Sequence, residues 1–100
     1  MTDQEILVKI LLSAQRALLG MIYPSIRAIA VDFEGIRKLK MIYYLDREPN
    51  EDDYENISEV TTEIFADINF LEVEELCIFS KEPFNNLDHL KAWVYMRKEG

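Results

Sequence analysis

The sequence predicts a single α+β domain over residues 1–100, in which two helices cover one face of a four-stranded, mostly antiparallel sheet. Three observations lead to this two-layer fold. Two segments repeat apolar residues with a helical period, four segments read as strands, and their order along the chain is α-β-β-α-β-β. One hundred residues suffice for one hydrophobic core. Two amphipathic helices on one sheet face are the simplest way to bury both apolar stripes.

The first helix is predicted over residues 2–19. Thr2 and Glu5 have the spacing of a capping box, in which each side chain satisfies a backbone N–H of the first turn. Gly20 stands where a residue in the left-handed conformation ends a helix. The apolar stripe between them consists of Ile6, Leu7, Ile10, Leu11, Ala14, Ala17 and Leu18.

A β-hairpin is predicted next, with strands over residues 25–33 and 36–45. Glu34 and Gly35 supply the turn, since Gly35 can take a positive φ. A period of two puts Arg27 on the face of Ile29, Val31 and Phe33, and Ile26 on the face of Ala28, Ala30 and Asp32. In the second strand, Lys38, Lys40, Ile42 and Tyr44 share one face, and Leu39, Met41, Tyr43 and Leu45 share the other.

The second helix is predicted over residues 51–67. Asn50 is a favourable N-cap, and Glu51, Asp52 and Asp53 suit the positive end of the helix dipole. The predicted buried stripe is Tyr54, Ile57, Thr61, Ile64, Phe65 and Ile68. Strands over residues 70–80 and 91–97 follow, separated by an irregular connection that contains Pro83.

The sheet face without helices is expected to be partly exposed. Aromatic residues on that face, from among Tyr44, Trp93 and Tyr95, would be natural contact anchors for a partner. The alternative is that each of them packs between the helices and the sheet.

Negative charge is concentrated in one part of the chain. The net charge is −8, but residues 46–75 contain twelve acids and one base and therefore carry −11. Glu55, Glu59 and Glu63 form one exposed helical row, although like charges at that spacing destabilise a helix. Such a field repels nucleic acids and anionic membranes and attracts basic partners. The alternative is a solvated face that only keeps the protein soluble.

The residues offer little for catalysis, for a metal or for a cofactor. His89 is the only histidine, and Cys77 lies in an apolar run typical of an inert core thiol. Asp46, Glu48, Asn50 and Asp52 alternate as calcium ligands do, but Glu51 stands where a calcium loop needs glycine. We therefore expect no enzyme, no metal site and no cofactor.

The compartment follows from the same residues. A single cysteine excludes an intramolecular disulfide. The chain starts with acidic residues where a signal peptide would be basic, and the apolar stretch over residues 6–21 is too short and too charged to span a membrane. We expect a cytoplasmic protein that binds neither nucleic acid nor membrane.

Several segments together resemble a known group of proteins. They are residues 16–20 (RALLG) with Pro24 and residues 27–28, residues 43–46 (YYLD) with residues 51–52, residues 62–64 (TEI) with residues 66–67, and residues 94–99 (VYMRKE). In these the chain resembles short acidic bacterial immunity proteins of polymorphic toxin systems, such as contact-dependent growth inhibition. The resemblance implies that the chain neutralises a toxin, often a basic nuclease, by covering its active site or an adjacent surface.

The leading hypothesis is therefore a protein that binds and blocks a cationic toxin domain. The expected contact residues are Tyr44, Glu51, Asp52, Tyr54, Glu55, Glu59 and Glu63. One alternative is a homo-oligomeric structural or regulatory domain that pairs through its exposed sheet face, and a weak homodimer is compatible with the leading hypothesis as well. Another alternative is an enzyme that uses carboxylates with a divalent ion.

Overall fold

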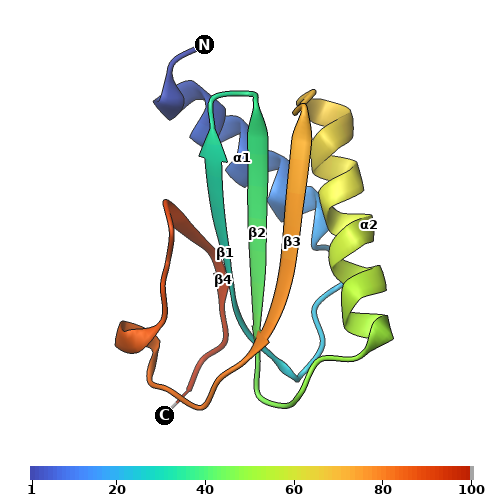
Figure 1. Ribbon diagram of the computed structural model, residues 1–100, viewed down its shortest axis with the longest axis vertical. Helices are drawn as coiled ribbons and strands as arrows, with labels where there is room; N and C mark the ends of the chain where they lie inside the picture. Colours follow the sequence, from blue (N-terminus) through green and yellow to red (C-terminus); the bar gives the residue numbers. More distant parts are fainter. Residues whose placement is uncertain (100) are drawn as a thin grey trace.

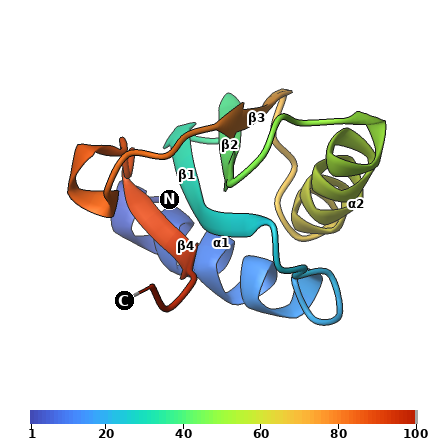
Figure 2. The same cartoon turned by 90° about the horizontal axis from the view of Figure 1, so that it is seen from below.

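A four-stranded sheet with both helices on one face forms the two layers of the protein, as the computed structural model of residues 1–99 shows (Figures 1 and 2). The predicted fold and the order α-β-β-α-β-β are confirmed. The elements are α1 (Asp3–Ala17), β1 (Ile26–Glu34), β2 (Lys38–Leu45), α2 (Glu51–Asp67), β3 (Glu72–Phe79) and β4 (Ala92–Met96), with the one-turn 3₁₀ helix η1 (Phe84–Asn86) before β4.

The strands lie in the order β3-β2-β1-β4. β1 is antiparallel to both β2 and β4, whereas β3 is parallel to β2. The mixed sheet is thus mostly antiparallel, as predicted, but the parallel pair was not foreseen. It arises because α2 carries the chain from the end of β2 back to the end where β2 began, so that the next strand runs in the same direction.

The predicted N-caps of both helices and the hairpin turn are confirmed. Thr2 accepts a hydrogen bond from the Glu5 N–H at 3.2 Å, and the Glu5 carboxylate accepts one from the Thr2 N–H at 3.3 Å. Asn50 caps α2 in the same reciprocal way, with Asp53 as its partner. Gly35 has a φ of 51° in the predicted hairpin turn, whereas α1 ends three residues before Gly20, at Ala17, and Gly20 with its φ of 77° lies in the turn that follows.

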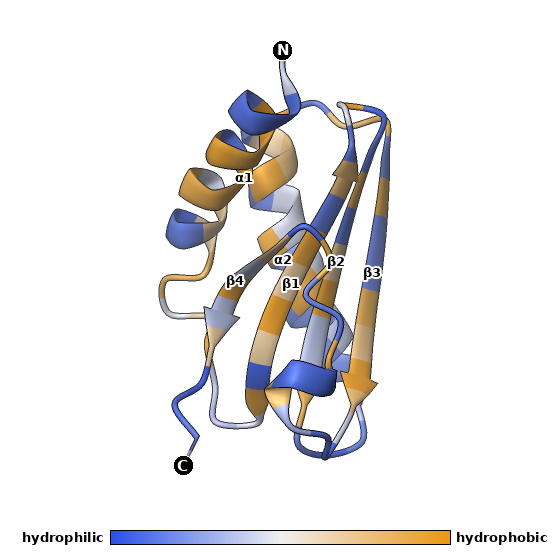
Figure 3. Cartoon of the chain, turned by 90° about the vertical axis from the view of Figure 1, so that its left-hand side faces the viewer, coloured by the Kyte–Doolittle hydropathy of each residue, from blue (hydrophilic) through white to orange (hydrophobic). Residues whose placement is uncertain are grey.

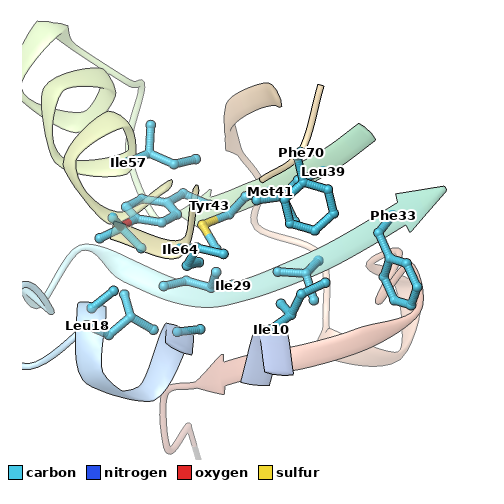
Figure 4. Packing of buried hydrophobic residues seen from close by; sticks show 14 of the residues in the cluster. Ile10, Leu18, Ile29, Phe33, Leu39, Met41, Tyr43, Ile57, Ile64 and Phe70 are labelled. Atoms are coloured by element: carbon cyan, nitrogen blue, oxygen red, sulfur yellow. The ribbon is translucent and has the colours of Figure 1, made fainter. Parts of the chain in front are cut away.

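The main core lies between the helices and the sheet (Figure 4). Ile10 of α1 and Ile64 of α2 are fully buried against Ile29 and Met41 of the central strands. Tyr43 is also fully buried, and its hydroxyl donates a hydrogen bond to Asn56 Oδ1 at 2.6 Å. A buried hydroxyl without a partner would cost roughly 1–3 kcal/mol, so this bond makes the tyrosine compatible with the core.

The predicted alternation fails at the start of β1. A bulge between Ile26 and Ala28 shifts the register against β2, and it exchanges the faces of Ile26 and Arg27. Ile26 joins the core on the helix side. Arg27 instead lies over the Phe84 ring at 5.0 Å and donates to the Ser80 carbonyl at 2.8 Å.

The second sheet face is covered at one end and open at the other, so the prediction of a partly exposed face is confirmed. The connection between β3 and β4 folds back over it, as Figure 3 shows. This connection and the adjoining strands form a small second core, which consists of Ala28, Ala30, Ile42 and Tyr44 with Leu76, Phe84, Leu87, Leu90 and Trp93. The remaining half carries charged side chains, among them Lys38, Lys40 and Glu74.

Among residues 1–99, no helix is long and apolar enough to cross a membrane.

Candidate interaction surface

The structure divides the twelve acids of residues 46–75 into two groups. Four are in ion pairs, with partners that include bases outside this segment, and a fifth accepts a hydrogen bond from a threonine. The ion pairs are Asp46 with Arg97, Asp53 with Arg47, Asp67 with Arg16, and Glu74 with Lys38 and Lys40. Glu75 accepts the hydrogen bond from Thr61. These five acids stabilise contacts between elements of the fold.

The other seven acids have no ion pair and no side-chain hydrogen bond to any described residue. They are Glu48, Glu51, Asp52, Glu55, Glu59, Glu63 and Glu72, and all are exposed. Five of the seven lie on α2, on the side that points away from the core. We call these five residues, Glu51, Asp52, Glu55, Glu59 and Glu63, the acidic face.

Part of the acidic face surrounds a shallow depression. Glu55, Glu59 and Glu63 line a shallow depression together with Ser58 and Thr62. Like-charged side chains at this spacing destabilise the helix by roughly 0.2–0.5 kcal/mol per pair. No described base lies close enough to any of the three to form an ion pair. The face therefore presents uncompensated negative charge to solvent.

An apolar groove runs beside the acidic face, between α2 and β3. It is lined by Thr61, Thr62, Phe65, Val73 and Glu75, and Thr62 borders both the groove and the depression. The predicted burial of Phe65 was wrong, because its side chain is 37% exposed and turns toward β3. Val60 takes the buried place instead, at helical spacing from Ile57 and Ile64.

Tyr54 lies on the same flank of α2 as Phe65. Positions 54, 61 and 65 are seven and four residues apart and therefore share one side of the helix. Tyr54 is 44% exposed, so it does not belong to the buried stripe in which the periodicity placed it. Its hydroxyl lies 3.4 Å from the Cys77 carbonyl of β3, which holds the ring at the end of the groove.

Tyr44, the remaining predicted contact residue, is not part of this surface. Its side chain is on the sheet face opposite α2, is only 5% exposed and packs against Trp93 at 5.9 Å between ring centroids. The hydroxyl donates to the Asp88 carbonyl at 2.8 Å. The connection that covers this face could not be placed from the sequence, because its irregular backbone has no periodic pattern.

Asp53 holds the N-terminal end of α2 in place. This role was not predicted from the sequence. It is 1% exposed and accepts hydrogen bonds from Arg47 at 2.7 and 3.0 Å, from the Asn50 N–H at 2.8 Å and from the Tyr23 hydroxyl. Burial by itself would raise the pKa of Asp53, but the bonds from Arg47, Tyr23 and Asn50 outweigh it and lower the pKa to about 2. The only signal in the sequence is its position three residues after the N-cap.

The residues considered for catalysis or metal binding lie apart from one another in the structure. Cys77 belongs to the helix-side core, and burial raises the pKa of its thiol to about 12. His89 is exposed and lies against Trp93 near the opposite sheet face. Within residues 1–99 no group of three or more His, Cys, Asp or Glu side chains is arranged to hold a metal ion. Of the acids weighed as calcium ligands, Asp46 is bound to Arg97, whereas Glu48 and Asp52 have no ion pair with any described residue.

The sequence model of a family described as MafI2 immunity protein matches residues 8–99. No curated protein matches the chain.

Proposed function

This chain belongs to the MafI2 immunity protein family, and from that membership we propose that it neutralises a cationic toxin by direct contact through the acidic face and the adjoining groove. An immunity protein has a toxin as its partner. One observation supports the choice of surface: five unpaired carboxylates lie on one side of α2, while the other two acids of this helix, Asp53 and Asp67, are in ion pairs.

The charge of the surface suggests the kind of toxin. A cleft that binds nucleic acid must be positive, because it holds a phosphate backbone. Glu55, Glu59 and Glu63 of the acidic face offer carboxylates along about two turns of helix. We propose that the toxin is a nuclease, that these carboxylates meet its basic substrate-binding surface, and that the two proteins meet in the cytoplasm.

The apolar groove can strengthen the complex in a way that exposed charges cannot. Exposed ion pairs are each worth only about 0–1 kcal/mol, so they accelerate encounter more than they strengthen the complex. Tight binding rests on a few side chains that lose their water on docking. Tyr54, Phe65 and Val73 are 44%, 37% and 37% exposed and lie beside the acidic face, where an apolar side chain of the toxin would bury them.

The direct test uses the purified protein and the toxin domain encoded beside its gene. Titrating the toxin with the protein should abolish nucleic acid cleavage at one molar equivalent, and calorimetry should give a 1:1 complex. A toxin that remains active, or an absence of binding at micromolar concentrations, would contradict direct neutralisation. If the toxin binds stoichiometrically but cleaves no nucleic acid, only its assignment as a nuclease is wrong.

A further inference from the structure

Helix α1 has a second apolar side that no described part of the chain covers. Its inner side, with Ile6 and Ile10, packs against the sheet. On its outer side Val8 is 48% exposed and Leu12 is 59% exposed, and Leu19 just beyond the helix is 77% exposed. Residues 8 and 12 are four apart and lie on one line along the helix, and Leu19 lies in the turn that follows it.

This line borders a groove between α1 and β4. Its lining is mostly apolar and consists of Leu11, Gln15, Leu18, Leu19, Ile22, Val94 and Tyr95. Single exposed apolar residues are common on protein surfaces, whereas a contiguous apolar patch indicates an interface. We call the line and its groove the α1 patch.

The charges around the α1 patch favour a second copy of the chain as its occupant. Two copies with a net charge of −8 each repel one another, so they can meet only where the local charge is low. Helix α1 carries two acids, Asp3 and Glu5, and two bases, Lys9 and Arg16, and is therefore neutral as a whole. The patch is also separate from the acidic face on α2.

The order of residues along α1 allows the helices of two copies to pair with each other. Val8 and Leu12 lie two positions before and two positions after Ile10. In an antiparallel pair of α1 helices whose two-fold axis lies at the level of Ile10, Val8 of one copy therefore meets Leu12 of the other.

We propose that the α1 patch is the interface of a homodimer, in which two α1 helices pack antiparallel about a two-fold axis near Ile10. Specific interfaces bury roughly 1,200–2,000 Å² in total. A contact built on one 15-residue helix from each copy is small on this scale. The dimer therefore dissociates in the micromolar range, and it leaves the acidic face of each copy open. This interface does not depend on the proposed toxin contact.

Sedimentation velocity of the protein alone tests the dimer. The wild-type sedimentation coefficient should rise from that of a monomer to that of a dimer between about 1 and 200 µM. Leu12→Gln should weaken the dimer at least about tenfold, because it places an amide in the centre of the apolar contact. Ile36→Gln is the matched control, because Ile36 is 49% exposed in the β1–β2 turn. A wild-type monomer at 200 µM, or an equal effect of both variants, would overturn the proposal.

Cysteine cross-linking tests the arrangement of the two helices. Val8→Cys and Leu12→Cys proteins, oxidised as a mixture, should form more disulfide-linked dimer than either variant alone, because the proposed two-fold axis pairs position 8 with position 12. Cys77 is buried and does not compete. More cross-linking in either single variant than in the mixture would contradict this packing. A monomeric protein whose Leu12→Gln variant no longer binds toxin would show instead that the α1 patch is a toxin contact.

Discussion

Reversal of Glu55, Glu59 and Glu63 to lysine should slow association with the toxin by about 10- to 100-fold. The physical reason is electrostatic steering, which raises association rates by roughly 10- to 1,000-fold and disappears when the sign of the docking surface is reversed. The fold should persist, because all three side chains are exposed and three lysines repel one another about as three glutamates do. Stopped-flow or surface-based kinetics measures the rate.

A control variant tests whether the position of the reversed charges matters, or only the change in net charge. Reversing Asp3, Glu34 and Glu82 also changes the net charge from −8 to −2, but at exposed positions outside α2. This control should keep most of the association rate. If both triple variants slow binding equally, the toxin responds to net charge and the acidic face has no special place in docking.

Asp53→Asn should lower the free energy of unfolding by about 3 kcal/mol, the largest single-residue effect we expect on stability. Breaking a buried ion pair costs roughly 3–5 kcal/mol, and Arg47 recovers part of that cost because its side chain is 39% exposed. For a domain of this size the loss lowers the melting temperature by about 15 °C. Asp52→Asn is the control on the same helical turn and should change stability by less than about 0.5 kcal/mol. Equal effects of the two substitutions would contradict the assigned role of Asp53.

The same carboxylate should make stability depend on pH in acid. Folding lowers the pKa of Asp53 from its usual 3.8 to about 2. Its stabilising contribution is therefore complete above about pH 4 and is lost as the pH falls toward 2. The difference in unfolding free energy between wild type and Asp53→Asn should shrink by about 2 kcal/mol over that interval. Denaturant unfolding at pH 6, 4 and 2 measures it, and a constant difference would contradict the lowered pKa.

The sequence predicted the elements well because their signals are local. Thr2 with Glu5 and Asn50 with Asp53 fix the starts of both helices, and the bounds of α2 agree with the prediction. The period of two in β2 correctly divided Leu39 and Met41 from Lys38 and Lys40. Each of these features depends on residues within about four positions of one another.

The features that were not predicted depend on distant contacts. The bulge that turns Arg27 away from the helices exists where β1 meets β2, and Arg27 then pairs with Glu99 at 2.9 Å. Tyr44 is buried by a connection more than forty residues later in the chain. The acidic segment was evident as a composition, but only the fold shows which acids are paired and which remain on the acidic face.

The salt dependence of toxin binding tests the central claim most directly. Between about 10 mM and 1 M salt the Debye length falls from roughly 30 Å to roughly 3 Å, so steering by the acidic face is screened. The association rate constant of wild type should fall at least about tenfold over this range, while the dissociation rate constant changes little. The Glu55, Glu59 and Glu63 reversal should remove most of that dependence. A wild-type association rate constant that is the same at low and high salt would contradict the account.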